Sequence, residues 1–260
     1  MAQDQYVIPS VQRAVRILQT LAAADQPLGV SELSRLLHLP KSTVFRIVTT
    51  LEREQFLERL DTDRFRIGVS AFKVGSAYAT HSDLESAFHR VARRLVDEHN
   101  ETVQLAILAG TDILYIAKED CSQSVRLVSK LGSCLPAHAT SLGKALLACL
   151  SDDELYALYP EGCFTPLTPH SHTLVSRLVE DLWRVRARGW AHDHEEVAVG
   201  LQCVGSAIYD SAGTPIAAIS ISIPSQRMTD ERVQGLGVAV RGAASEIGSL
   251  LGNLSPGRAG

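Results

Sequence analysis

One segment of the sequence carries arginines and hydroxyls at a spacing that suits contact with nucleic acid. Read as a helix, residues 39–59 (LPKSTVFRIVTTLEREQFLER) place four polar side chains on one face, namely Ser42, Arg46, Thr49 and Arg53. Arginine reads guanine through a bidentate contact in the major groove, and hydroxyls reach phosphates or base edges. The opposite face is apolar, so the segment predicts a helix that packs by one side and offers the other to DNA.

Further candidates for contact with DNA flank this face. Lys41 and Thr43 lie in the first helical turn, where free N–H groups attract phosphate, and Phe45 could touch a thymine methyl group. Arg64 and Arg66, in the segment that follows, could contact the DNA backbone or the minor groove. A solvated helix face, or a winged helix that binds only protein, would show the same pattern. The predicted DNA-binding residues are Lys41, Ser42, Thr43, Phe45, Arg46, Thr49, Arg53, Arg64 and Arg66.

A second set of polar side chains lies in an apolar strand pattern near the C-terminus. In residues 217–224 (AAISISIP) three isoleucines alternate with Ser220 and Ser222, so a period of two places both serines on the face opposite the isoleucines. If that face lines a cavity, two hydroxyls can hold a small polar anion, and N–H groups at a helix start near Thr140 and Ser141 could assist. Cys203 lies on the partner strand of the same predicted hairpin. A solvated strand face and an ordinary core cysteine are the alternatives.

The segments around the arginine-bearing helix predict the elements that would position it. Ser10 can cap a first helix, and residues 31–37 predict a shorter second helix after a turn with proline and glycine. Pro40 fits the first turn of the third helix, and two short strand patterns flank residues 61–63. Helix, helix, turn, helix and hairpin is the order of a winged helix-turn-helix. Residues 69–80 are again helical in pattern and would join this module to the rest.

The remainder of the chain mixes strand and helix patterns, which predicts an α+β domain. Residues 151–154 (SDDE) fit a capping box, in which a serine caps a helix and the glutamate three residues later returns the contact. One predicted helix ends at Gly189, and Thr229 opens the last helix. Strands are predicted within 102–118, at 125–132 and within 203–224, and helices at 84–99, 140–150 and 173–188.

Composition limits the class of protein. The chain has 260 residues, 45% hydrophobic and 21% charged, which is typical of one large or two ordinary globular domains. Residues 1–75 carry a net charge of +2 and the rest −6, so an argument for nucleic acid rests on where the arginines lie. The five cysteines form no CxxC pair, which favours reduced thiols. We find no secretory signal and no apolar run of the roughly 18 residues that span a membrane, so we expect a cytoplasmic protein.

Five blocks of the sequence together resemble the IclR family of bacterial transcription regulators. They are SVQRAVRILQTLA (10–22), LPKSTVFRIVTTLE (39–52), LPAHATSLGKALLA (135–148), HDHEEVAVGLQCVG (192–205) and AAISISIP (217–224). The resemblance implies flexible tails at 1–9 and 255–260, a winged helix-turn-helix at 10–68, a linker helix at 69–82 and a GAF-like effector-binding domain at 83–254. It also implies a homodimer, or a dimer of dimers, that binds a palindromic operator in double-stranded DNA. We expect no enzymatic activity and no cofactor.

The resemblance also assigns an effector site. In the family the effector is a small carboxylate-type metabolite, so we expect a small organic acid effector for this chain. The residues that would surround it correspond to Ser141, Leu142, Asp193, Cys203, Ser220 and Ser222. Family members that sense glyoxylate or pyruvate keep the cysteine, so Cys203 favours a short, polar acid. The chain departs from the family in two places, which bear on the size of the pocket: it reads VGSA at 204–207, where a proline is usual, and Ala137 stands where leucine is common.

Two other classes of function compete with a DNA-binding sensor. Cys203 and Ser141 are candidate nucleophiles, but the sequence has no GxSxG elbow and no glycine-rich phosphate loop, so an enzyme is not favoured. A metal- or redox-responsive regulator that uses the same DNA-binding domain is the second alternative. It rests on the histidine pairs at 170/172 and 192/194, and on a zinc ion shared by Asp193 and Cys203. We predict no metal-binding residue, because paired histidines without CxxC are a weak signal.

Overall fold

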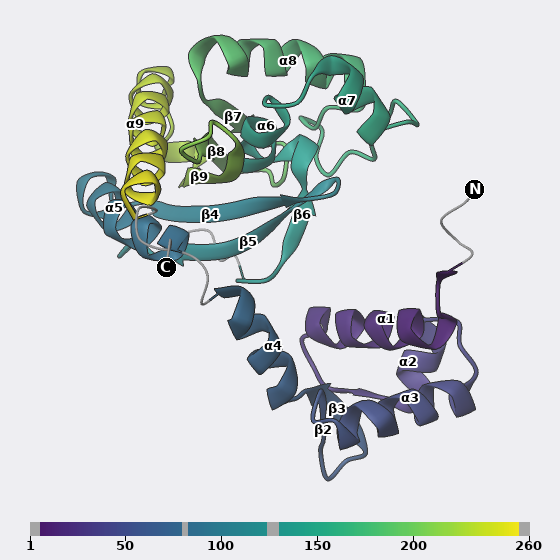
Figure 1. Cartoon of the computed structure of the whole chain (residues 1–260). Coiled ribbons are helices and arrows are strands. Elements are labelled where there is room, and N and C mark those ends of the chain that lie inside the picture. The colour runs from purple at the N-terminus through teal and green to yellow at the C-terminus, as the bar shows by residue number, and fades with distance from the viewer. Residues whose placement is uncertain (1–5, 80–82, 124–129, 255–260) are drawn as a thin grey trace. The chain divides into compact units, whose positions relative to one another are not determined.

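The protein comprises two compact units, each of which is described by itself. The computed structural model describes residues 6–79, 83–123 and 130–254, and its internal contacts divide the chain into residues 1–82 and 83–260 (Figure 1). Among the described residues, no helix is long and apolar enough to cross a membrane. Both units combine helices with antiparallel strands, which confirms the predicted α+β class.

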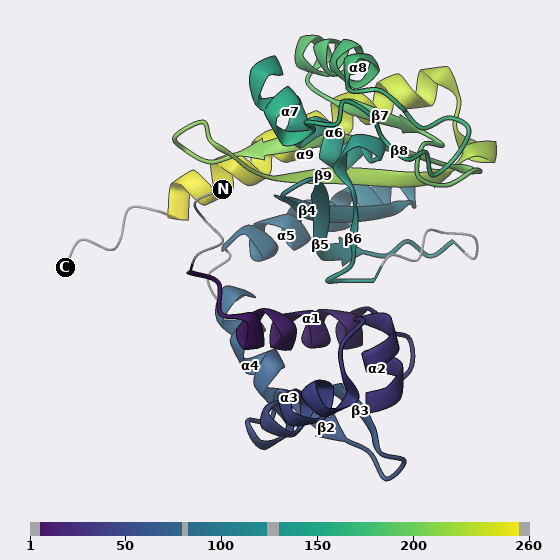
Figure 2. The same ribbon diagram turned by 90° about the vertical axis from the view of Figure 1, so that its right-hand side faces the viewer.

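The N-terminal unit is a winged helix-turn-helix. The β2–β3 hairpin extends past the helices as the wing (Figure 2), and the strands pair in the antiparallel order β1-β3-β2. The elements are α1 (Pro9–Ala23), β1 (Leu28–Gly29), α2 (Val30–Leu36), α3 (Lys41–Arg53), β2 (Leu57–Arg59) and β3 (Arg64–Ile67). Apolar side chains of the helices and the wing enclose one core, which contains Ile17, Leu21, Leu33, Val44, Val48, Leu57 and Phe65.

Two helix starts in this unit differ from the prediction, by two residues in α1 and by one in α3, and both involve proline. α1 begins at Pro9 with Ile8 at the N-cap, so the prediction that Ser10 caps this helix is wrong. Proline suits the first helical position because its missing N–H would have no partner inside the helix. Pro40 occupies the N-cap of α3 with an extended ψ of 138°, rather than the first turn. The third helix therefore begins at Lys41.

The helix that follows the wing is α4 (Val69–Ala79). The linker helix was predicted to end near residue 80 and its boundary was set at 82, but residues 80–82 lie outside the described residues. The same holds for residues 1–5 of the predicted N-terminal tail and for the whole predicted tail at 255–260. Within the described part of the first tail, residues 7 and 8 precede α1 without regular structure.

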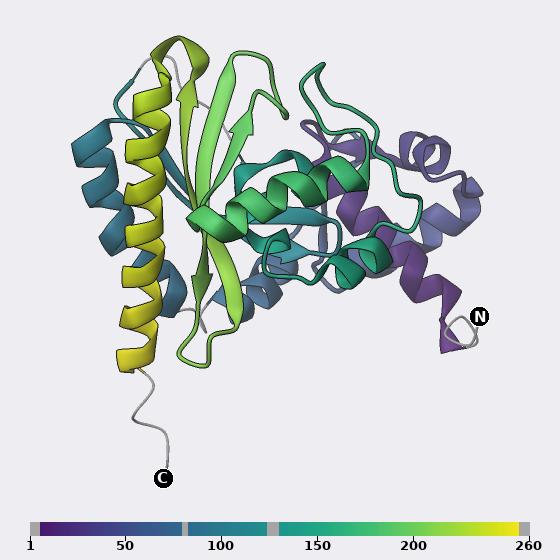
Figure 3. The same ribbon diagram turned by 90° about the horizontal axis from the view of Figure 1, so that it is seen from above.

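The C-terminal unit is built on a six-stranded antiparallel sheet with helices on both faces (Figure 3). The strand order is β6-β5-β4-β9-β8-β7; α5 and α9 cover one face, and α6, α7 and α8 cover the other. The strands are β4 (Thr102–Ala109), β5 (Asp112–Glu119), β6 (Cys134–Pro136), β7 (Ala191–His194), β8 (Leu201–Tyr209) and β9 (Pro215–Pro224). The helices are α5 (Asp83–His99), α6 (Ser141–Leu147), α7 (Asp152–Leu158), α8 (Val175–Arg188) and α9 (Asp230–Leu254).

Local sequence signals account for several of these bounds. Ser151 and Glu154 form the predicted capping box, in which Glu154 N donates to Ser151 Oγ at 3.3 Å and Ser151 N donates to Glu154 Oε2 at 2.8 Å. α8 ends at Gly189, whose φ of 81° lies in the left-handed region that glycine adopts without strain. Of the strand predicted at 125–132, residues 125–129 lie outside the described residues and residues 131–132 form a turn.

Strand register brings polar residues from distant segments to one place. Ser222 of β9 pairs with Cys203 of β8, and Ser220 lies on the same side of β9. The isoleucines of β9 pack into the core under α5 and α9, whereas both serines face the side of α6, which confirms the period-two prediction. Gly205 of β8 permits this close approach, because a β carbon there would lie only 3.1 Å from Ser141 Oγ. Gly205 thus leaves room for the start of α6.

Candidate DNA-binding surface and effector cavity

The outward face of α3 presents the predicted stripe to solvent. Its four residues are exposed, while Val44 and Val48 on the opposite face are fully buried. Phe45 also exposes 53% of its surface. Lys41, Arg46 and Arg53 form no ion pair with any residue that the structure describes. The positive charge of this face is therefore not neutralised within the described part of the unit.

The wing arginines, in contrast, are engaged within the unit. Arg64 Nε donates to the Pro27 carbonyl at 2.7 Å, and its Nη2 donates to both carboxylate oxygens of Glu32 at 2.8 Å. Arg66 forms a two-point contact with Glu58, its cross-strand neighbour, at 2.9 Å. This hydrogen bond is the largest cause of the lowered pKa of Glu58. Predicted contacts of the wing arginines with DNA therefore compete with ion pairs that already exist, whereas those of α3 do not.

A cavity of about 50 Å³ lies in the C-terminal unit at the start of α6. Ser222 does not line it; its Oγ donates to Gln104 Oε1 at 2.8 Å and accepts from Cys203 Sγ at 3.2 Å, so it orients lining residues from behind. The other five predicted effector residues line the cavity, namely Ser141, Leu142, Asp193, Cys203 and Ser220. Thr140, at the helix start considered from the sequence, also lines it. The lining residues that were not predicted are Gln104, Tyr115, Leu135, Val197, Ala198 and Leu201.

Gln104 is the missed residue for which the sequence held a signal. It is the one polar side chain in the apolar stretch VQLAIL at 103–108, and it is 1% exposed. A buried amide needs hydrogen-bond partners, and Ser222 supplies one of them. Sheet register places Gln104 directly opposite Ser220, which brings the amide to the cavity. A polar residue inside an otherwise apolar strand was therefore a pointer to this site.

Ser220 is the least satisfied polar group of the cavity. Its side chain is 1% exposed, and its Oγ has no hydrogen-bond partner among the described residues. Leaving a buried hydroxyl without a partner costs roughly 1–3 kcal/mol. Thr140, on the same wall, already uses its Oγ1 to accept from Gly143 N at 2.9 Å, which caps α6. A ligand that hydrogen-bonds to Ser220 would remove this cost.

The wall of the cavity changes its charge near neutral pH. Burial raises the pKa of Asp193 to about 7, although Lys144 and backbone N–H groups act in the opposite direction. Asp193 Oδ1 accepts from Glu196 N at 2.7 Å. Burial, and after it the charge of Asp193, raises the pKa of the Cys203 thiol well above its usual value. The thiol therefore stays protonated at neutral pH, and Asp193 is the group whose ionisation sets the charge of the wall.

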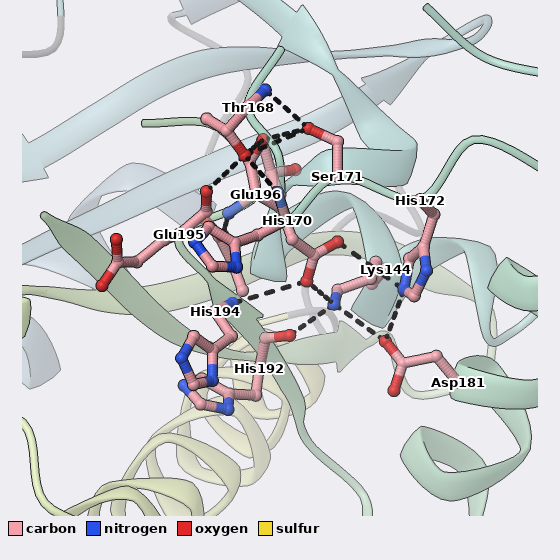
Figure 4. A network of polar contacts seen from close by, with 12 residues as sticks. Lys144, Thr168, His170, Ser171, His172, Asp181, His192, His194, Glu195 and Glu196 are labelled. Carbon is pink, nitrogen blue, oxygen red and sulfur yellow. Dashed lines mark hydrogen bonds and ion pairs between the residues drawn. The ribbon is translucent and has the colours of Figure 1, made fainter. Parts of the chain in front are cut away.

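A buried lysine lies directly behind this wall (Figure 4). Lys144 of α6 is 1% exposed, and its Nζ donates to Asp181 Oδ2 at 2.8 Å, to Glu196 Oε1 at 2.5 Å and to the His192 carbonyl. Burial alone would lower the pKa of Lys144, but Glu196 and Asp181 raise it, so the amine stays charged. Lys144, Asp181 and Glu196 are not among the site residues predicted from the sequence. A lysine inside the apolar block SLGKALLA was the available signal.

Four histidines lie on the outer side of this network. His192 and His194 alternate with Asp193 along β7, so they face away from the cavity that Asp193 lines. His170 and His172 of the loop before α8 reach the same side. Burial lowers the pKa of His192 to about 4, and its Nε2 lies 2.9 Å from Gln202 Oε1. In the described ranges, no third metal-binding side chain joins Asp193 and Cys203, the pair considered from the sequence as a zinc site.

The sequence matches the two characteristic parts of one protein family. Residues 10–61 match the IclR helix-turn-helix domain, and residues 76–249 match the family described as Bacterial transcriptional regulator IclR C-terminal. The chain belongs to the IclR family of bacterial transcriptional regulators. The resemblance drawn from the five sequence blocks is therefore confirmed, and the stripe on α3 lies in the DNA-binding domain of an IclR-family regulator.

Named relatives extend over almost the whole chain. The HTH-type transcriptional repressor AllR of Salmonella typhi is 38% identical over 248 residues, which cover 95% of this chain and 91% of that repressor. The structure of the Thermotoga maritima IclR is 28% identical, with a TM-score of 0.72 and coverage of 94% of this chain and 99% of its own. An IclR homolog of Microbacterium hydrocarbonoxydans, solved with 4-hydroxybenzoate, shares the fold at 23% identity, with a TM-score of 0.80 and coverage of 93% and 98%.

Proposed function

We propose that this IclR-family protein is a repressor whose affinity for its operator changes when a short organic acid binds in the cavity of the C-terminal unit. Ser220 carries the proposal: a buried hydroxyl without a described partner faces a cavity whose other polar groups include Ser141, Asp193 and Cys203. AllR is named as a repressor, and the Microbacterium homolog was solved with an organic acid. AllR supports the role as a repressor, and the Microbacterium homolog supports the binding of an organic acid.

The DNA-binding half rests on α3. Its exposed face carries Arg46 and Arg53, and within the described residues neither guanidinium is paired with a carboxylate. These groups are available for guanine edges or phosphates, and the hydroxyls of Ser42 and Thr49 lie beside them. We infer that the protein binds as a homodimer, or as a dimer of dimers, so that two copies of α3 read the two halves of a palindromic operator in double-stranded DNA.

The cavity limits the size of the acid. Its volume of about 50 Å³ is several times the roughly 10–15 Å³ that a cavity needs to hold one water molecule. An acid of two or three carbons suits this space, whereas a benzoate ring does not. Its carboxylate can accept hydrogen bonds from the hydroxyls of Ser141 and Ser220, and protonated Asp193 adds another donor.

Thermal unfolding in the presence of short carboxylic acids tests the effector site, because a ligand that binds only the native state raises its stability. We expect at least one acid of two or three carbons to raise the unfolding temperature of the wild type, and Ser220→Ala to abolish this shift. Ser206→Ala is the matched control, since Ser206 is a buried serine whose Oγ donates to the Gly189 carbonyl at 2.9 Å, outside the cavity. The assignment fails if Ser220→Ala responds as the wild type does.

A further inference from the structure

Three side chains with metal-binding atoms converge on the outer side of the effector cavity (Figure 4). His172 lies in the loop before α8, Asp181 in α8 and Glu196 in the turn after β7. His172 Nε2 lies 3.4 Å from Asp181 Oδ2 and 3.7 Å from Glu196 Oε2, and the three ligand atoms all lie within 4.8 Å of one another. The ligands of a tetrahedral zinc ion are about 3.3 Å apart when the bonds measure about 2.0–2.2 Å. Small side-chain movements would therefore complete a three-ligand site.

One oxygen of this cluster lacks a partner. Glu196 is 4% exposed, and Lys144 donates to its Oε1, but its Oε2 has no hydrogen-bond partner in the described part of the chain. A buried carboxylate oxygen without a donor is costly, more so than a neutral group. The unpartnered oxygen lies on the side of His172, and both residues line a surface hollow of about 380 Å³. This arrangement points to a cation between the carboxylate and the imidazole.

Hydrogen bonds fix the loop that carries His172 against the turn that carries Glu196. Thr168 Oγ1 donates to the Glu195 carbonyl at 2.7 Å, and Ser171 Oγ donates to the Glu196 carbonyl at 2.7 Å (Figure 4). Both donor residues are buried. The imidazole is therefore held beside the carboxylates by contacts that do not involve a metal, so little ordering remains to be done when an ion binds.

We propose that His172, Asp181 and Glu196 bind a divalent transition-metal ion of the Zn²⁺ class, with solvent or a further ligand at the fourth position. Lys144 neutralises part of the charge of the two carboxylates, and Arg184 also lines the hollow. The site thus offers few oxygen ligands and little negative charge to Ca²⁺ or Mg²⁺. An imidazole ligand favours Zn²⁺ and its transition-metal neighbours. Lys144 contacts Glu196 through Oε1, which leaves Oε2 for the ion. It contacts Asp181 through Oδ2, the oxygen that lies 3.4 Å from His172 Nε2, so the ion and the ammonium share this oxygen.

The turn that would hold the ion also forms part of the effector cavity. Glu196 N donates to Asp193 Oδ1 at 2.7 Å, and Asp193 and Val197 line the cavity. An ion bound to Glu196 fixes this turn and with it one wall of the cavity. We therefore expect the acid to bind more tightly to the zinc-loaded protein. This consequence rests on the proposed function, whereas the binding of zinc does not.

Zinc binding to the full chain tests the site directly. Protein treated with EDTA is titrated with ZnCl₂ in competition with a chelating dye, and bound zinc is counted per chain. We expect one zinc ion per chain and at least about tenfold weaker binding in His172→Ala, since even the loss of residues behind the ligands weakens metal sites by that factor. His170→Ala is the matched control, because His170 lines the same hollow and is not one of the three ligands. Cys203→Ser reports on zinc in the effector cavity.

Equal zinc affinity in wild type and His172→Ala overturns the proposal, as does loss of zinc in His170→Ala or Cys203→Ser, or a wild type that retains no zinc. The His172 side chain is 25% exposed, so we expect the variant to fold. Circular dichroism checks this, and His172→Gln provides a second variant. Intact zinc binding without any response to acids would count against the proposed effector alone.

Discussion

At the scale of single residues, the cavity proposed to bind an acid has no positively charged residue in its lining. Its polar lining consists of hydroxyls, amide and thiol groups and the Asp193 carboxyl. The Lys144 ammonium behind the wall is engaged by Asp181 and Glu196. Protonation of Asp193 therefore decides whether the wall donates a hydrogen bond to a carboxylate or repels it. This conclusion leads to two predictions about pH and one about Lys144.

Stability should depend on pH through Asp193. Burial raises the pKa of Asp193 in the folded chain to about 7, whereas the pKa of an unfolded aspartate is about 3.9. Between these values the folded chain holds the proton and the unfolded chain does not, so this stabilisation is complete below about pH 4 and is lost as the pH rises through about 7. Relative to Asp193→Asn, the wild type should lose about 1 kcal/mol of unfolding free energy per pH unit in this window. Urea unfolding at several pH values measures this, and parallel profiles for the two proteins would contradict it.

Binding of the acid should depend on pH through the same group. The acid stays ionised between pH 6 and pH 8, so it binds to the form in which Asp193 is protonated. Above pH 7 we expect the dissociation constant to rise by up to about tenfold per pH unit, and in Asp193→Asn it should stay constant. Isothermal titration at pH 6 and pH 8 provides the comparison. Tighter binding at pH 8 in the wild type would show that Asp193 does not face the acid.

The Lys144 network should be worth far more to stability than a surface pair. Lys144→Met would leave the buried Glu196 and the half-buried Asp181 without their cation, and breaking such a buried pair costs about 3–5 kcal/mol. Arg66→Met is the control, because the Arg66–Glu58 pair is more than half exposed and such pairs contribute at most about 1 kcal/mol. Chemical unfolding of both variants gives the two free energies. Similar losses would mean that solvent reaches the Lys144 site.

At the scale of elements, α3 and the wing hold their arginines in different states. Arg46 is unpaired within the described residues, whereas Arg66 is bound to Glu58 at 2.9 Å. Arg46→Ala should therefore weaken operator binding by about 1–3 kcal/mol and relax one base position. Arg66→Ala removes a charge that is already neutralised, so its affinity and its salt dependence should change less. Operator binding at several salt concentrations tests both. An equal loss in Arg66→Ala would mean that the wing pair opens on DNA.

Element positions follow from local signals, which is why the sequence predicts them well. The capping box at Ser151 and the glycine stop at Gly189 each involve residues within one turn of the boundary. The misplaced start of α1 is equally local, since proline at the first position replaced the expected serine cap. The Arg64–Glu32 pair depends on how β3 packs beside α2. No spacing in the sequence predicts such a contact. The sequence therefore predicts the wing arginines as cations, but it does not predict their ion pairs with carboxylates.

The candidate site was predictable only in part, for the same physical reason. Five cavity residues came from the family resemblance, and alternation in β9 placed Ser220 on the correct face. Gln104 joins them through sheet register, and the partners of Lys144 come from α8 and from the turn after β7. Pairing between distant segments is set by tertiary packing. A single polar residue in an apolar segment indicates that a buried polar contact exists, but it does not identify the partner residue.

At the scale of the whole molecule, the proposed sites for the acid and the operator lie in different units, Asp83–Gly260 and Met1–Ser82. The acid can change operator affinity only if it prefers one arrangement of the chain over another. We expect a coupling of about 1–3 kcal/mol, and operator DNA must change the affinity for the acid by the same factor. Replacing Ser220 and Ser222 together by alanine should abolish the coupling and leave operator affinity without acid unchanged, because both serines lie in the C-terminal unit. Fluorescence anisotropy of labelled operator, with and without the acid, measures both quantities. If the double variant still responds as the wild type does, the acid binds outside this cavity. If no acid affects the wild type, a protein partner becomes the better candidate for the signal.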